Sequence, residues 1–213
     1  MRTTDLPIHQ RTKFVEGWWL TGVLIAVIFS VATVLAVGIG GSSGARAALL
    51  LTGRTSLALF MLAFTAAALH QLWPNNLTSW IRRNRRYLGV SFAGSHAIHA
   101  IAIALLIAYA GTHAIPPPFK HVSLQLGMIP LFAGYLSIVA MTATSFDRTA
   151  ALIGPNTWHW LHLVGSYVIW ADFAEAYGPR AIRDPAFIPA FIIVAAALII
   201  RLTAYAQRTR KGH

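Results

Sequence analysis

The chain has 213 residues, of which 56% are hydrophobic and only 11% are charged. Soluble domains usually carry about 25% charged residues. Here the apolar residues come in runs of roughly 20, the length that crosses the hydrocarbon of a bilayer. Because the sequence contains no cysteine, disulfides, thiolate-bound iron–sulfur clusters and a cysteine nucleophile are excluded. The composition therefore predicts a polytopic membrane protein that uses the whole chain for one bundle.

The formal net charge of +11 raises the question of a nucleic-acid partner. The basic residues, however, lie at the ends of the apolar runs and not on one soluble face, which is the pattern that orients helices in a membrane. We therefore expect membrane lipid, and no nucleic acid, as the partner of this charge.

The first apolar run predicts a span over residues 18–40. At about 22 residues it exceeds the roughly 7–15-residue apolar core of a signal peptide, so we interpret it as a membrane helix. The glycine- and serine-rich residues 38–44 predict a flexible connection to a second span over 54–73, which a turn containing Pro74 closes.

A third span is predicted over 86–110, ahead of three prolines at 116–118 that cannot continue a helix. The remaining spans are predicted over 122–144, from Pro155 to about Tyr177, and over 186–206. The expected fold is therefore all-α, a six-helix transmembrane bundle.

The predicted bundle covers residues 18–206, between an N-terminal tail of residues 1–17 and a C-terminal tail of residues 207–213. If both termini and the loops after the second and fourth spans share one side, that side carries 12 of the 17 Lys and Arg residues. The side richer in Lys and Arg is normally cytoplasmic. We therefore expect both tails in the cytoplasm.

Two pairs of histidines lie inside predicted spans, where an ionisable group is costly and is by default a functional hypothesis. His96 and His99 are three apart in the third span, and His159 and His162 are three apart in the fifth, so each pair shares a helix face. Two helices that present imidazoles inward provide what bis-histidine ligation of a haem iron needs.

The depth of these residues favours one pairing. At 1.5 Å per residue, His96 lies about 15 Å beyond Arg86, and His162 lies about 9 Å beyond Asn156. His96 with His162 is the closest match, although which histidine of each pair is the ligand stays open. A purely structural or proton-handling role without metal is the alternative. Zinc is a weaker rival, because no cysteine is present and the carboxylates of this span lie far from His162.

Three segments resemble the ferric reductase-like transmembrane domain family over roughly residues 50–205. They are Thr52-Gly53-Arg54-Thr55 at the start of the second span, Arg85-Arg86-Tyr87-Leu88-Gly89 at the start of the third, followed by His99, and Trp158-His159-Trp160-Leu161-His162 at the start of the fifth, followed by Tyr167. That family includes the haem-binding membrane subunit of the bacterial periplasmic methionine-sulfoxide reductase system.

The resemblance implies a b-type haem protein of the bacterial inner membrane that passes electrons as part of a reductase system. It implies His99 and His162 as iron ligands, whereas His96 has no clear counterpart in the family pattern. Apart from the resemblance, we expect one histidine of each pair, His96 or His99 and His159 or His162, to be a hydrogen-bonding neighbour of the site or to lie over a haem propionate. Arg86, in the arginine cluster before the third span, is a candidate contact for a haem propionate. A second histidine of the fifth span is replaced by Glu175, so one haem is expected.

The sequence contains no G-x-G-x-x-G and no P-loop, and no soluble segment large enough to bind a nicotinamide or flavin. A quinol or flavoprotein would then have to donate the electrons, and a separate partner would accept them. Two other classes of function remain open: a non-redox transporter whose histidines relay protons or bind substrate, and a haem-free interaction protein.

Overall fold

A computed structural model describes residues 16–110 and 124–211, and within them the chain is helical throughout apart from short connections. The all-α prediction is therefore confirmed for this part of the chain. The elements are α1 (Gly17–Ile39), α2 (Gly41–Leu72), α3 (Asn76–Arg83), α4 (Arg85–Ala110), α5 (Leu124–Ala143), α6 (Asp147–Arg183), the 3-10 turn η4 (Pro185–Phe187) and α7 (Ile188–Lys211).

The predicted tails have different outcomes. The N-terminal tail was predicted over residues 1–17. Residues 1–15 of it lie outside the described part of the chain, and α1 begins at Gly17. The predicted C-terminal tail begins at 207, but α7 continues as a helix to Lys211, and residues 212–213 lie outside the described part.

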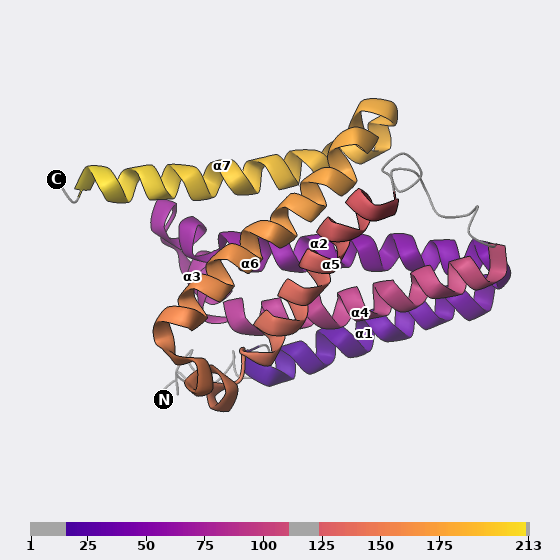
Figure 1. Ribbon diagram of the computed structural model, residues 1–213, viewed down its shortest axis with the longest axis horizontal. Coiled ribbons are helices and arrows are strands. Elements are labelled where there is room, and N and C mark those ends of the chain that lie inside the picture. The colour runs from indigo at the N-terminus through magenta and orange to yellow at the C-terminus, as the bar shows by residue number, and fades with distance from the viewer. Residues whose placement is uncertain (1–15, 111–123, 212–213) are drawn as a thin grey trace, which may run out of the picture.

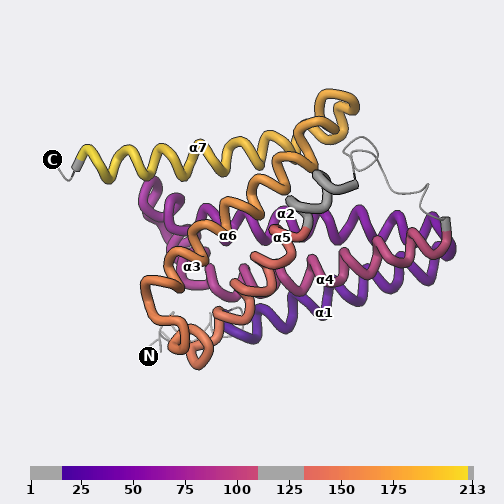
Figure 2. The backbone as a smooth tube through the Cα atoms, viewed as in Figure 1, coloured from indigo at the N-terminus to yellow at the C-terminus, as the bar shows by residue number. Residues whose placement is uncertain are grey.

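The long helices run in alternating directions and pack into one bundle (Figure 1). Helices α1, α2 and α4 lie side by side, α5 and α6 cross them at an angle, and α7 packs along α2 and α6. The tube drawing shows that α1 starts, and α7 ends, towards the same end of the bundle (Figure 2). The first turns of α4 and α6 lie at that end too, so it carries the arginine-rich segments predicted to be cytoplasmic.

Four helical segments among the described residues are long and apolar enough to cross a membrane: Gly17–Ile39, Gly41–Leu72, Arg85–Tyr109 and Pro185–Arg210. Large apolar side chains on these helices point outward, such as Val37, which is 76% exposed. An apolar surface of this extent is stable against lipid and unfavourable against water. These helices therefore support the prediction of a membrane protein.

The second span begins earlier than predicted, at Gly41 and not at residue 54. Apart from Gly40, the glycines and serines that we interpreted as a flexible connection belong to helices, and Gly40 and Gly41, with φ values of 75° and 56°, turn the chain between α1 and α2. A Cβ on Gly44 would lie 2.4 Å from the carbonyl oxygen of Ala36, so the missing side chain lets α2 approach α1 closely. Close packing thus overrides the weak helix propensity of glycine.

The predicted turn after the second span leads into an additional short helix, α3. Its N-terminus has a capping box, in which the Asn75 side chain accepts a hydrogen bond from the Thr78 backbone N–H at 2.9 Å and the Thr78 hydroxyl accepts one from the Asn75 N–H at 3.0 Å. A capping box satisfies backbone donors that a helix start otherwise leaves unpaired. The box therefore explains why this eight-residue segment is helical.

The fifth predicted span corresponds to α6, which is interrupted at Gly154, where φ is 73° and ψ is 161°. Pro155 follows as the first residue of the main part of the helix, a position that proline favours. The predicted start at Pro155 therefore agrees with the start of the long part of α6 after the kink. The helix ends at Arg183, six residues beyond the predicted end at Tyr177.

Helices α2 and α4 meet along a row of small polar side chains. Ser95 Oγ lies 3.0 Å from Ser56 Oγ and 2.9 Å from Thr55 Oγ1, and one turn farther along the same contact Thr52 Oγ1 lies 3.0 Å from His99 Nδ1. Small residues let two helix backbones approach closely in a membrane, and their hydroxyls bond across the contact. This row fixes the rotation of α4 and therefore where its histidines point.

Candidate functional site

A cavity of about 310 Å³ lies between α2, α4, α5 and α6. Phe60, Phe64 and Phe92 form much of its apolar wall, and Arg85 and Arg86 belong to its polar wall. Ligand sites in proteins are typically concave, mostly apolar and about 300–1,000 Å³ in volume, with a few polar groups that orient the ligand. The cavity matches that description at the small end of the range.

The polar wall of the cavity has an excess of positive charge. Arg86 forms an ion pair with Asp147 at 2.8 Å and lies with its guanidinium carbon 5.4 Å from the centre of the Trp18 ring. Arg85 also lines the cavity. With two guanidinium groups and one largely exposed carboxylate, this wall favours a ligand that carries negative charge.

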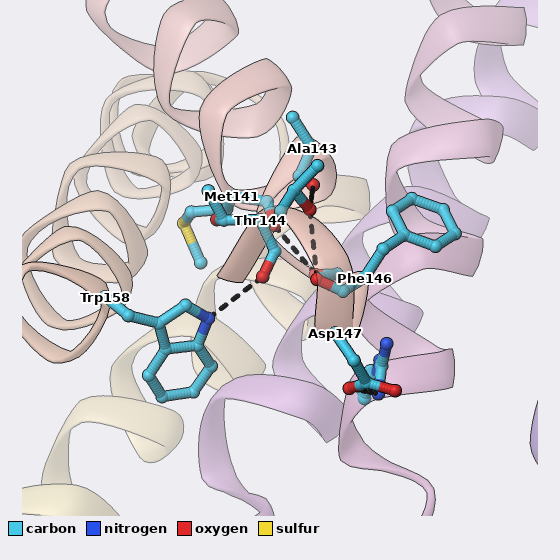
Figure 3. Close-up of polar contacts among 9 residues, drawn as sticks. Met141, Ala143, Thr144, Phe146, Asp147 and Trp158 are labelled. Atoms are coloured by element: carbon cyan, nitrogen blue, oxygen red, sulfur yellow. Dashed lines mark hydrogen bonds and ion pairs between the residues drawn. The ribbon is translucent and has the colours of Figure 1, made fainter. Parts of the chain in front are cut away.

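His162 is the histidine of the cavity wall, and it contacts two neighbouring side chains, those of Trp158 and Thr144, which Figure 3 labels. Its ring stacks on Trp158 with the ring centres 4.2 Å apart, and its Nε2 lies 3.1 Å from the hydroxyl of Thr144, in the turn directly after α5. Trp158 in turn donates from its indole N–H to the Thr144 carbonyl oxygen at 2.9 Å. His162 is therefore anchored between α5 and α6.

His96 and His99 form a separate cluster on α4. Their ring centres are 5.4 Å apart, and His96 also packs against Tyr135 of α5 at 5.2 Å and Phe173 of α6 at 6.4 Å. His99 is hydrogen-bonded to Thr52, whereas Nδ1 of His96 is buried and has no hydrogen-bond partner among the described residues. The two imidazoles thus share a helix face, as their spacing predicts.

The two histidine clusters lie at different levels of the bundle. Phe173, which contacts His96, is eleven residues beyond His162 on α6, and this separates the two levels by about 16 Å along the helix axis. His162 leans the other way, against Trp158. The rings of Phe60, Phe92 and Phe173 pack together between the clusters, with centres 5.1 to 6.1 Å apart.

This geometry bears on the fit of a haem to the predicted residues. Bis-histidine ligation needs two imidazoles that face each other across one iron. His162 does not face either histidine of α4, so this arrangement brings together neither His96 with His162 nor His99 with His162. The cavity offers instead one imidazole, two guanidinium groups and an aromatic wall.

The other predicted site residues are placed as follows. Arg86 lies in the cavity wall with His162. His159 is exposed on α6, with Trp160 as its aromatic neighbour at 6.2 Å, and does not line the cavity. Glu175 is also exposed. Within residues 16–110 and 124–211, no three His, Asp or Glu side chains are grouped so that they could hold a metal ion.

Two residues of the site were missed by the sequence reasoning as partners of the histidines. Trp158 lies four residues before His162, a spacing that places both on one helix face and could have indicated the contact. Thr144 lies in the turn after α5, far from His162 in sequence, and had no local signal. Thr52 stands in one of the segments that carry the family resemblance, but its partner, His99, is 47 residues away.

No family model matches the chain, and comparison with the curated proteins and with the solved structures gives no significant match.

Proposed function

We propose that the chain is a membrane b-type haem protein that transfers electrons as the membrane component of a reductase system. The observation that carries this proposal is the cavity beside His162, which is lined by an imidazole, two arginines and an aromatic wall. The resemblance of three sequence segments to the ferric reductase-like family supports it independently.

The roles of the residues follow from their chemistry. His162 would hold the haem iron through its imidazole, and Arg85 and Arg86 would pair with the propionates. The thioether of Met141 lines the same wall. Phe60 and its aromatic neighbours exclude water from the inner end of the cavity. The haem would supply one-electron chemistry, while the protein sets its potential through ligation, burial and charge.

The topology that accompanies this proposal is six membrane spans with both termini in the cytoplasm of a bacterial cell. It is supported by the alternating direction of the helices and by the gathering of arginines at the end where α4 and α6 begin. The cavity then lies near the cytoplasmic face. A quinol or a flavoprotein reaching that face would be the electron donor, and a separate partner would be the acceptor.

A second candidate function belongs to another class. The basic wall of the cavity also favours a haem-free protein that binds or transports a small anion. Among the described residues no second histidine faces His162, which agrees with this function as well. In that case the histidines handle protons or substrate. The presence or absence of haem separates the two functions.

The test is the reduced-minus-oxidised absorption spectrum of the full chain purified from membranes supplied with haem. The proposal predicts the sharp α band of a b-type haem, and its absence would favour the anion-binding function. His162→Ala should lower the haem content at least tenfold. The matched control is His159→Ala, three residues earlier on the same helix but exposed, which should retain the haem.

His99→Ala tests the position of the site. We expect this variant to retain its haem, because His99 lies three residues beyond His96 on α4, and the level of His96 is already about 16 Å from that of His162 along α6. If His99→Ala removes the haem and His162→Ala does not, the function survives and the placement in the cavity is wrong.

A further inference from the structure

His99 and His162 lie in different parts of the bundle, yet each has one ring nitrogen within hydrogen-bond distance of a threonine hydroxyl. The distances are 3.0 Å from Thr52 Oγ1 to His99 Nδ1 and 3.1 Å from Thr144 Oγ1 to His162 Nε2. The two contacts involve different ring nitrogens, and the direction of each hydrogen bond decides which tautomer the histidine adopts.

The direction follows from the other bonds of the two hydroxyls. Thr52 Oγ1 lies 2.8 Å from the Ala48 carbonyl oxygen, and Thr144 Oγ1 lies 2.7 Å from the Ala140 carbonyl oxygen. A carbonyl oxygen can only accept, so at these distances the single hydroxyl proton must point to the carbonyl. Each hydroxyl therefore accepts a hydrogen bond from the imidazole.

We propose that Thr52 and Thr144 are positioning residues that hold His99 and His162 as opposite neutral tautomers. His99 carries its proton on Nδ1 and leaves the lone pair on Nε2. His162 carries its proton on Nε2 and leaves the lone pair on Nδ1. The nitrogen available to accept a proton or to bind a metal is therefore Nε2 in His99 and Nδ1 in His162.

The surroundings of His99 are consistent with a ring held in one orientation. Thr52 is fully buried, at 0% exposure, and the Cε1 atom of His99 would lie 3.2 Å from a Cβ on Gly53. The bare backbone of Gly53 thus makes room for the ring beside the threonine that orients it. A hydrogen bond that fixes one imidazole nitrogen is also the usual support for a ligand at the other.

For His162 the inference deepens the proposed function, because it assigns Nδ1 as the nitrogen that would bind the iron; the tautomers themselves do not depend on haem. The experiment is therefore made on the full chain in lipid nanodiscs, purified without added haem and labelled with ¹⁵N in the histidine rings. The ring nitrogen resonances distinguish bare from protonated nitrogens, and His99→Gln and His162→Gln variants assign them.

We expect the wild-type chain to show a protonated Nδ1 and a bare Nε2 for His99, and the reverse for His162. Thr52→Val should lower the tautomer ratio of His99 roughly fivefold, the effect of losing one hydrogen bond, and leave His162 unchanged. Thr144→Val should do the converse. Thr52→Ser, which keeps the hydroxyl, should restore the wild-type ratio.

The matched control is Thr65→Val, because Thr65 is buried on the same helix and donates to the Met61 carbonyl oxygen at 2.7 Å. It should alter neither histidine. The inference is overturned if wild-type His99 is protonated on Nε2, a result that needs no variant to fold, or if Thr52→Val leaves the ratio unchanged. Opposite tautomers in a chain that never binds haem would overturn the proposed function alone.

Discussion

The guanidinium of Arg86 lies 2.8 Å from the carboxylate of Asp147, and this pair joins the first turn of α4 to the first turn of α6 in the cavity wall. The Asp147 side chain is 93% exposed. Exposed ion pairs contribute about 0–1 kcal/mol, so this one does little for the stability of the fold. Its consequence is to keep Arg86 directed at the edge of the cavity.

The first prediction concerns this arginine. Arg86→Gln should lower the fraction of haem that stays bound through detergent washing by roughly tenfold, because a hydrogen bond to a charged group contributes about 1.5–3 kcal/mol. The absorbance of retained haem measures the effect. Arg82→Gln is the control, since Arg82 is exposed on α3 and does not line the cavity. Equal retention in both variants would exclude Arg86 as a propionate contact.

The second prediction concerns the contact between Gly53 and His99. In Gly53→Ala the new methyl group would lie 3.2 Å from the His99 ring, which the hydrogen bond to Thr52 holds in place, so the ring cannot move aside freely. We expect a loss of about 1–3 kcal/mol in stability, as for other overpacked sites, measured by thermal unfolding in detergent. Gly22→Ala, with nothing within 4 Å of the added Cβ, should be neutral or stabilising. An unchanged Gly53→Ala melting curve would contradict the prediction.

The third prediction tests the close contact of α1 with α2. A Cβ at Gly44 would lie 2.4 Å from the Ala36 carbonyl oxygen and 2.9 Å from that of Leu35, both of them backbone atoms that cannot rotate away. Gly44→Ala should therefore separate the two helices and destabilise the protein more than Gly53→Ala does. Thermal unfolding of the two variants side by side gives the comparison, and the reverse order would show that the hairpin is loosely packed.

The fourth prediction concerns Arg201 of α7. Its guanidinium carbon lies 4.2 Å from the centre of the Phe64 ring and 4.7 Å from that of Tyr167, and it donates to the Phe64 carbonyl oxygen at 3.2 Å. Arg201→Lys keeps the charge but loses the planar group that stacks on both rings, and should cost about 1 kcal/mol.

Thermal unfolding again measures the loss. Arg210→Lys, an exposed position in the last turns of the same helix, should leave the midpoint unchanged. If the two variants behave alike, the stacking of Arg201 contributes nothing measurable.

Local features of the sequence were enough for the helical class and for the positions of most long helices. A run of apolar residues and a proline act on their own segment, so α1, α4 and α5 begin and end within two residues of the predicted limits. The pairing of His96 with His99 on one face is equally local, because a spacing of three residues fixes it in any α-helix.

The start of α2 depended on a contact that no local pattern contains. A glycine-rich segment has the same composition whether it is a flexible connection or a closely packed helix, and the backbone of α1 beside Gly44 decides between them. The same holds for Thr144, in the turn after α5, and His162 of α6, because the hydrogen bond between them sets the orientation of the imidazole.

The sequence by itself determined that this protein is a bundle of membrane-length helices with imidazoles in its interior, since burial of apolar runs and helical periodicity are properties of single segments. Only the tertiary structure decided how far α4 and α6 slide past each other. That offset places His162 in a basic cavity and leaves His96 about 16 Å away along the axis of α6, with His99 beyond it, behind packed aromatic rings. The offset between two packed helices along their axes depends on how the side chains of both helices interlock. The sequence of one helix alone does not specify it.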